Sequence, residues 1–239
     1  MHPLCSDEDR IRGHGSNGRL YSTPEEAERE KQAAAEAGAE LVTAGMRVGL
    51  GTGSTIAYLL RFLAARAVND VVYVATSPQT EQAARKLRLD VRPLTRFGHL
   101  DLAIDGADQI EPTGWLVKGG GGAHTREKVV AAAAERFVVI ASSKKLVDAL
   151  APPIPLELLP FGLKSTLRLL EPVALRPTPP TPDGGLLADH LGPVEDPDEL
   201  ATRLSLTPGV VEHGLFPLHL TSEILVATGS SVRRFLPAA

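Results

Sequence analysis

One segment, residues 101–128, constrains this chain more than any other; it reads DLAIDGADQIEPTGWLVKGGGGAHTREK. Two aspartates, Asp105 and Asp108, follow an apolar run, and Lys118 leads into four consecutive glycines, Gly119 to Gly122. Each glycine costs backbone entropy on folding and has no side chain to pack. The run therefore indicates close backbone approach and free N–H donors. Together with the carboxylates and the lysine, these donors suit a small, polyhydroxylated, anionic substrate.

The length and charge of the chain exclude several classes of protein. With 239 residues it can bury a proper core, as one large domain or two small ones. The net charge is -4, without the basic patch of a nucleic-acid-binding protein. Cys5 is the only cysteine, the first residues lack the apolar core of a signal peptide, and no apolar run reaches membrane-spanning length. We expect a soluble, cytoplasmic protein with no nucleic-acid or membrane partner.

The first predicted helix follows a segment without hydrophobic periodicity. Residues 1–22 are polar and Gly-rich, and we interpret them as a disordered tail. Thr23 is a good N-cap, Pro24 fits the first helical position, and Glu26 completes a capping box, so a helix is expected to about residue 41. Lys31 lies on this helix, where spacing alone favours a solvated surface charge.

Strand and helix patterns alternate over residues 46–150, which predicts an α/β unit with a Rossmann-like parallel sheet and helices on both faces. In such sheets, ligands bind beyond the carboxyl ends of the strands. The expected strands are 46–50, 71–76, 100–104, 115–118 and 137–141, with a short one at Val91, and the expected helices are 55–65, 78–87 and 125–136.

A glycine turn, residues 51–54, joins the first strand to the next helix. Its N–H groups are expected at the positive end of the helix dipole, which attracts anions. The dinucleotide fingerprint G-x-G-x-x-G fails at Ser54, and no Gly-Lys-Ser/Thr of a nucleotide P-loop follows. A generic phosphate loop and a purely structural turn both stay open.

Charged residues gather at the same predicted edge of the sheet. For Asp105 and Asp108 we favour acid/base or hydroxyl-binding roles slightly over turn chemistry, and we see no metal-ligand set around them. Glu127 lies in the first turn of a helix, whose dipole lowers its pKa, whereas burial or nearby carboxylates raise it. The sequence leaves that balance open. Lys145 follows a strand, and a surface lysine is its default interpretation.

Proline clusters mark a boundary near residue 151. We expect domains at 23–150, to which residues 221–239 return, and at 151–220, which forms a smaller α+β (ferredoxin-like) unit. Its expected elements are strand 155–159, helix 162–170, strand 173–176, a Pro-rich hairpin, strand 186–191, helix 197–206 and strand 210–216. A last strand, 224–228, is expected to rejoin the main sheet.

The combination of motifs resembles one family, the type A ribose-5-phosphate isomerases. The matching segments are GLGTGST (49–55), DGAD (105–108), VKGGGGAHTREK (117–128) and SSKKLVD (142–148), and PLELLPFG, PDGGLLAD and PGVVEHGLF are similar to the family's second domain. The resemblance covers essentially everything after residue 22, and the spacing between motifs carries the weight. The chain departs from the family at Gln109, where an acidic residue is usual, at His124, where an apolar one is common, and at the hairpin 182–185, where Asn is frequent.

The resemblance implies interconversion of D-ribose 5-phosphate and D-ribulose 5-phosphate through a cis-enediolate, in the non-oxidative pentose phosphate pathway. It implies Glu127 as the base, Asp105 as the group that assists ring opening and moves a proton between O1 and O2, and Lys118 as an oxyanion stabiliser. It implies no metal or organic cofactor, and a homodimer or homotetramer. The implied substrate-binding residues are Thr52, Gly53, Ser54, Thr55, Asp105, Gly106, Ala107, Asp108, Lys118, Gly119, Gly120, Gly121, Lys145 and Lys31. Lys145 is preferred to Lys144 because counting without gaps from Glu127 reaches it.

Two other classes of function are weighed against the isomerase. A non-catalytic sugar-phosphate sensor of this fold normally has a helix-turn-helix ahead of the domain, and the sequence before Thr23 is too short for one. Another enzyme of the fold, a CoA transferase or a phosphosugar lactonase, would act on a different substrate, and the transferase would use its glutamate as a nucleophile. The spacing of DGAD, KGGGG and TREK favours the isomerase.

Overall fold

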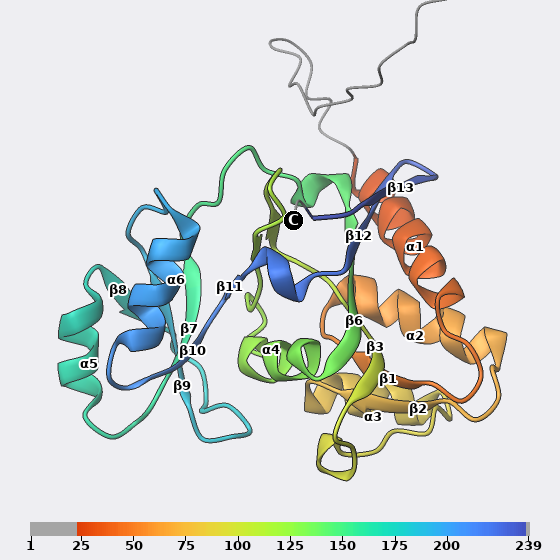
Figure 1. The fold of residues 1–239 in the computed structure, drawn as a ribbon, viewed down its shortest axis with the longest axis horizontal. Helices are drawn as coiled ribbons and strands as arrows, with labels where there is room; N and C mark the ends of the chain where they lie inside the picture. Colours follow the sequence, from red (N-terminus) through yellow and green to blue (C-terminus); the bar gives the residue numbers. More distant parts are fainter. Residues whose placement is uncertain (1–22, 238–239) are drawn as a thin grey trace, which may run out of the picture.

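The computed structural model describes residues 23–237. The tail predicted for residues 1–22 and the last two residues of the predicted C-terminal return therefore lie outside the described residues. Two units lie side by side, a main unit with a six-stranded sheet and a smaller unit with a four-stranded sheet (Figure 1). Among the described residues, no helix is both long enough and apolar enough to span a bilayer.

The six-stranded sheet has the order β13-β12-β6-β3-β1-β2. All of its neighbouring strands pair in parallel except β12 and the edge strand β13, which are antiparallel. Because helices or loops cover both faces, the central strands are apolar along their length. The strands are β1 (Arg47–Leu50), β2 (Val72–Ala75), β3 (Leu100–Asp105), β6 (Ala134–Ser142), β12 (Glu223–Thr228) and β13 (Ser231–Phe235).

Helices cover both faces of this sheet, as predicted. Helices α1 (Pro24–Glu40), α2 (Ser54–Arg66) and α3 (Pro78–Lys86) share one core with Leu102 and Ile104 of β3. Helix α4 (His124–Ala132) packs on the other face, in a core that includes Leu100 and Ala103 of the same strand. The capping box at the start of α1 is confirmed: Thr23 Oγ1 accepts from Glu26 N–H, and Glu26 accepts from Thr23 N–H.

The smaller unit is built from β7 (Ile154–Leu158), α5 (Leu163–Leu170), β8 (Val173–Leu175), β9 (Leu186–His190), α6 (Pro197–Leu206) and β10 (Val210–His213). Its antiparallel sheet has the order β10-β7-β9-β8, which is the β-α-β-β-α-β arrangement expected of a ferredoxin-like unit. All of its strands lie within residues 154–213, although the exact domain bounds stay a prediction.

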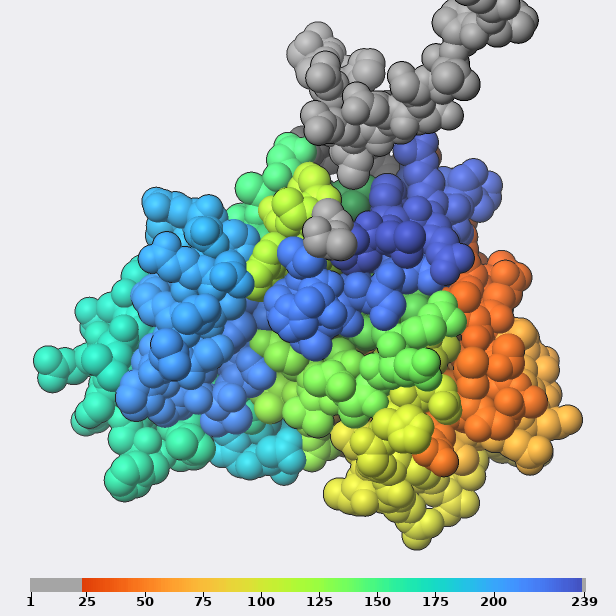
Figure 2. All heavy atoms as spheres, viewed as in Figure 1, coloured from red at the N-terminus to blue at the C-terminus, as the bar shows by residue number. Residues whose placement is uncertain are grey.

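A three-stranded sheet joins the two units. Strands β4 (Gln109–Ile110), β5 (Leu116–Val117) and β11 (Leu215–Phe216) pair antiparallel in the order β11-β5-β4. Leu116 and Phe216 pack in the core of the main unit, whereas Val117 and Leu215 pack in that of the smaller unit. Figure 2 shows that the C-terminal residues, in blue, form much of the surface where the two units meet.

The structure corrects three predicted elements. The helix expected at 125–136 ends at Ala132, because β6 begins at Ala134, where it pairs with Leu100 of β3. The strand expected at 210–216 breaks at Gly214, and its two halves enter different sheets. Val91 forms only an isolated bridge with Tyr73 rather than a strand. The short strand β4 and the edge strand β13 were not predicted.

Glu30 on α1 is buried and joins three parts of the main unit. Its carboxylate accepts hydrogen bonds from the N–H and hydroxyl of Ser143, at 3.1 and 2.9 Å, and from the N–H of Gly229, at 3.1 Å. Ser143 follows β6, and Gly229 lies between β12 and β13. This carboxylate therefore holds α1 against the carboxyl ends of two strands.

We predict that Glu30→Ala lowers the free energy of unfolding by ~2–3 kcal/mol, because buried donors lose a charged acceptor. Denaturant unfolding followed by circular dichroism measures it. The control is Glu36→Ala, a change at an exposed position of the same helix that is expected to stay within about 0.5 kcal/mol of the parent. Equal effects of the two changes would contradict the role given to Glu30.

Candidate active site

The residues singled out in the sequence meet at the carboxyl edge of the main sheet. The loops after β1 and β3, the glycine run and the 3-10 turn Ser143–Lys145 surround a cavity of about 130 Å³. A pocket beyond the carboxyl ends of parallel strands is where this fold class binds ligands. The cavity is lined by Thr52, Gly53, Ser54, Thr55, Gly106, Ala107, Asp108, Lys118, Gly119, Gly120, Gly121, Glu127 and Lys145.

At the base of the cavity, one buried ammonium group lies between two buried carboxylates. Lys118 Nζ is 2.8 Å from Asp105 Oδ2 and 3.1 Å from Glu127 Oε2, and it donates to the carbonyl of Gly106 at 2.6 Å. All three charged residues are at most 5% exposed. Glu127 Oε2 is buried, and its contact with Lys118 is an ion pair.

The position of Asp105 depends on the loop after β1. Its Oδ1 accepts hydrogen bonds from the N–H of Gly106 at 2.7 Å and from that of Thr52 at 3.1 Å. A Cβ on Gly51 would lie only 1.7 Å from the same oxygen, so this position excludes every side chain. Sequence analysis placed Gly51 in a phosphate loop but did not see that it makes room for Asp105.

The glycine run folds into a tight turn whose N–H groups face different ways. Gly119 has a φ of 101°, and its carbonyl accepts from the N–H of Gly122 at 2.9 Å. The N–H of Gly120 donates to Asp108 Oδ2 at 2.8 Å. No acceptor among residues 23–237 takes the N–H of Gly121, although Gly121 lines the cavity. Gly121 is therefore the candidate for the free donor that the sequence predicts.

The buried charges shift one another's ionisation. Burial raises the pKa of Glu127 to about 7, and the charge of Asp105 adds to the rise while Lys118 opposes it. Burial also raises the pKa of Asp105, opposed by Lys118 and by the backbone donors. Burial disfavours the charge of Lys118, but the two carboxylates hold its pKa above the ordinary value. The balance that the sequence left open at Glu127 is thus decided by burial rather than by the helix dipole.

Phe216, which sequence analysis missed, lies next to the buried lysine. Its ring centroid is 5.4 Å from Lys118 Nζ and 5.0 Å from Lys128 Nζ, within the range of cation–π attraction. The residue comes from β11, about a hundred positions after Lys118 in sequence, and no local pattern connects the two.

The lysines proposed to bind phosphate have different positions. Lys145 lines the cavity, and its Nζ is 3.9 Å from Asp108 Oδ1. Lys144 is not among the lining residues. Lys31 is also absent from the lining, and its ammonium pairs with Glu28 at 2.6 Å, so its substrate role stays a prediction.

His124, where the family commonly has an apolar residue, is buried against the glycine run. A Cβ on Gly119 would lie 2.6 Å from the Cβ of His124. Burial, with the nearby charge of Lys128, lowers the pKa of His124 to about 3, so the ring is neutral and packs as an apolar residue does. Within the described residues, no group of three or more His, Cys, Asp or Glu side chains is arranged to hold a metal ion.

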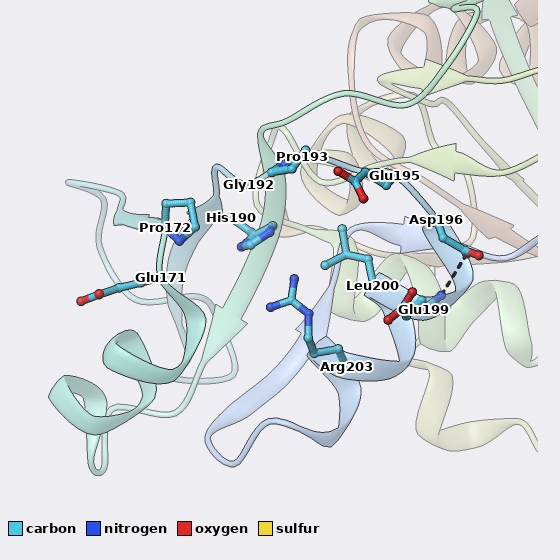
Figure 3. Close-up of a pocket in the computed structure, with 10 residues that line it drawn as sticks. All are labelled: Glu171, Pro172, His190, Gly192, Pro193, Glu195, Asp196, Glu199, Leu200 and Arg203. Carbon is cyan, nitrogen blue, oxygen red and sulfur yellow. Dashed lines mark hydrogen bonds between the residues drawn. The ribbon is translucent and has the colours of Figure 1, made fainter.

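A second cavity, of about 260 Å³, lies on the smaller unit and shares no lining residue with the first (Figure 3). Its lining includes Arg203 and several carboxylates, but these charged groups are on the surface. The buried member, His190, has its Nδ1 3.3 Å from the carbonyl of Leu170. We place the candidate site at the sheet edge, because that cavity is lined by the buried Lys118 and Glu127 and by the glycine run.

Comparisons with known proteins identify the family to which the chain is similar. Residues 72–231 match the family model described as "Ribose 5-phosphate isomerase A (phosphoriboisomerase A)". The chain is 43% identical to the ribose-5-phosphate isomerase A of Caulobacter vibrioides over 226 residues, which cover 88% of this chain and 99% of that protein.

Solved structures give the same result. A ribose 5-phosphate isomerase A from Neisseria gonorrhoeae superposes with a TM-score of 0.84 at 29% identity, covering 89% of this chain and 98% of that one. A D-ribose-5-phosphate isomerase in complex with phospho-erythronic acid superposes with a TM-score of 0.83 at 31% identity, covering 88% and 99%.

The raised pKa of Glu127 leads to a prediction about stability. Because Glu127 ionises at 4.5 when unfolded and at about 7 when folded, its ionisation destabilises the parent progressively across that interval. Glu127→Gln has no carboxyl group to ionise and does not lose this stability. The Tm of the variant minus the Tm of the parent is therefore expected to increase by roughly 5 °C from pH 5 to pH 8. Calorimetry at the two pH values measures it, with the exposed Glu135→Gln as control. A difference that does not change with pH would contradict the raised pKa.

Proposed function

The chain belongs to the ribose 5-phosphate isomerase A family of aldose–ketose isomerases, and we propose that the cavity at the sheet edge is where it interconverts D-ribose 5-phosphate and D-ribulose 5-phosphate. The observation that carries this proposal is the buried group of Asp105, Lys118 and Glu127, of which Lys118 and Glu127 line the cavity together with Gly121. The reaction needs a base for carbon-bound protons and positive charge for the oxyanion that forms when the proton leaves. This cavity offers both.

Glu127 is the proposed base. In the direction of ketose formation it removes the proton from C2 of the open-chain aldose and returns it to C1, through a cis-enediolate. A base works best when its pKa is close to the working pH, and the pKa of Glu127 is about 7. Glu127 is one of the residues that line the cavity, so its carboxylate can approach the substrate carbon.

Asp105 and Lys118 are the proposed partners of the base. Lys118, whose raised pKa keeps it protonated, stabilises the charge that develops on the substrate oxygens, together with the N–H of Gly121. Asp105 assists ring opening and carries a proton between O1 and O2. Each protein group therefore returns to its starting protonation state after a turnover. Because the ammonium contacts both carboxylates, it also keeps base and proton carrier on the same side of the substrate.

The substrate phosphate is proposed to lie on the loop Thr52–Thr55. This loop begins α2, whose N-cap is Gly53 and receives no side-chain cap, so the first N–H groups of the helix are free for an anion. Lys145, opposite this loop in the lining, adds a positive charge, and Asp108 binds a sugar hydroxyl.

The family also supports proposals about the setting of the enzyme. We propose a place in the non-oxidative pentose phosphate pathway, a cytoplasmic location, and a homodimer or homotetramer. Apolar side chains exposed on the smaller unit support an assembly that covers them; they include Phe161, which is 92% exposed, and Leu169, which is 60% exposed.

The proposed function is tested by measuring ribulose 5-phosphate formation from D-ribose 5-phosphate, with a chelator present. We expect an active parent and a Glu127→Gln variant whose kcat falls by ~10³-fold or more while KM changes little, because the base is lost and the substrate contacts remain.

In the parent, kcat/KM is expected to fall as pH drops through about 7, since protonated Glu127 cannot act as a base. The control is Glu135→Gln. An active parent with an equally active Glu127→Gln would transfer the role of base to Asp105.

The two adjacent lysines provide a matched test of the phosphate site. Lys145→Met is expected to raise KM by ~10-fold or more, since a charge pairing with the substrate phosphate is worth at least ~1.4 kcal/mol in a partly enclosed site. Lys144→Met, next to it but outside the lining, is expected to change KM less than ~2-fold. Steady-state kinetics at constant ionic strength measure both. The reverse ranking would assign the phosphate contact to Lys144.

A further inference from the structure

One arginine of the smaller unit reaches into the glycine run of the main unit. Arg176 directly follows β8, and its Nη1 donates to the carbonyl of Gly119 at 3.1 Å and to that of Gly120 at 3.2 Å. Its side chain is only 15% exposed. Sequence analysis found nothing chemical in this part of the chain, and Arg176 is not among the residues that line the cavity.

A carboxylate of the smaller unit fixes the guanidinium of Arg176. Asp189 on β9 accepts from Arg176 Nε at 2.8 Å and from Nη2 at 2.6 Å, which is a bidentate pair. Such a pair fixes the plane of the guanidinium as well as its position. The remaining donor, Nη1, is therefore aimed at the two glycine carbonyls by a rigid fork.

Fixing these carbonyls also fixes two N–H groups. In a planar trans peptide, the carbonyl of one residue and the N–H of the next point in opposite directions. The Gly119 carbonyl thus sets the direction of the Gly120 N–H, which reaches Asp108, and the Gly120 carbonyl sets that of the Gly121 N–H, which is free at the cavity. Without a side chain at either position, such peptides can rotate easily unless something holds them.

We propose that Arg176, anchored by Asp189, is a positioning residue that holds the N–H of Gly121 toward the substrate and the N–H of Gly120 on Asp108. The inference rests on the proposed function, because it assigns the Gly121 donor to the developing oxyanion of the substrate and Asp108 to a sugar hydroxyl. It makes the smaller unit part of the catalytic apparatus, through a residue that touches neither the substrate nor the reacting groups. A fixed donor stabilises a transition state because no reorganisation is needed at the moment of reaction.

A second arginine offers a matched control. Arg126 on α4 also pairs with a carboxylate of the smaller unit, Asp183, through Nε at 2.6 Å and Nη2 at 2.8 Å. Like Arg176 it ties the two units together, but it contacts no carbonyl of the glycine run. If Arg176 served only as a tether between the units, the two arginines would have similar effects.

The experiment compares Arg176→Met, Arg176→Lys, Asp189→Asn and Arg126→Met with the parent. Arg176→Met is expected to lower kcat by ~100-fold, the size of the effect when one positioned donor is lost, with KM changed less than ~3-fold. Arg176→Lys restores part of the rate, because an ammonium can donate to the glycine carbonyls but cannot keep the bidentate pair with Asp189. The kcat of Asp189→Asn is expected to lie between those of Arg176→Met and the parent. The kcat of Arg126→Met is expected to stay within ~3-fold of the parent's.

A binding measurement separates positioning from loss of structure. Phospho-erythronic acid carries a carboxylate where the enediolate oxygens form, whereas inorganic phosphate reports only on the phosphate site. In Arg176→Met and Asp189→Asn, affinity for phospho-erythronic acid is expected to fall ~10-fold or more while affinity for phosphate is unchanged. Calorimetric titration measures both, and retained phosphate binding shows that each variant is folded.

The outcomes separate the proposed function from the positioning role of Arg176. An inactive parent overturns the proposed function. An active parent in which Arg176→Met lowers kcat no more than Arg126→Met does, or loses both ligands equally, overturns the positioning role. If Arg176→Met does not fold, Arg176→Lys and Asp189→Asn decide, because each keeps one half of the pair. A rate loss confined to the Arg176 and Asp189 variants, with selective loss of the carboxylate ligand, supports the inference.

Discussion

The burial of Lys118 between Asp105 and Glu127 is the interaction on which the rest of the site depends. Removing charges from water is costly, and replacing a buried ion pair with apolar side chains often stabilises a protein. Its burial therefore fits the role in catalysis that we propose better than a role in stability. One ammonium cannot fully compensate two buried carboxylates, and the excess negative charge, together with burial, is what raises the pKa of Glu127 to about 7. Burial and the charge of Asp105 thus bring the pKa of this carboxylate close to neutral pH.

The placement of these charges uses residues from both units. Asp105 needs the open space at Gly51, and the backbone of Lys118 pairs with Gly214, which lies between a strand of the smaller unit and one of the junction sheet. At Gly214 a Cβ would lie 2.2 Å from the carbonyl of Lys118, so the chain can pass this point only as glycine. Phe216, two residues later, completes the wall beside the ammonium. The break in the predicted strand 210–216 is therefore the point where the smaller unit is joined to the active site.

Local patterns in the sequence were sufficient for much of this structure. Alternating apolar segments predicted the parallel strands, a capping box marked the start of α1, and the position of Asp105 after an apolar run put it at the carboxyl edge. The errors arose where distant residues decide. Ala134 belongs to β6 because Leu100 pairs with it, although alanines fit a helix equally well. Phe216 and Arg176 have no nearby motif, since their roles come from contacts with residues roughly a hundred and roughly sixty positions earlier, and such contacts are set by tertiary packing rather than by local propensity.

The glycine run shows why a second unit is useful to such a site. Glycines allow the backbone to approach a substrate closely, but the same freedom would let the donors turn away from it. Here two of the glycines are held from outside: the N–H of Gly120 donates to Asp108, and the carbonyls of Gly119 and Gly120 accept from Arg176. At Gly121, by contrast, a Cβ would meet nothing within 4 Å, so the missing side chain leaves room rather than avoiding a clash. The glycines of the run have a large conformational freedom, but contacts with other residues fix their backbone. One of these contacts comes from Arg176 of the smaller unit, in which the sequence showed no chemistry.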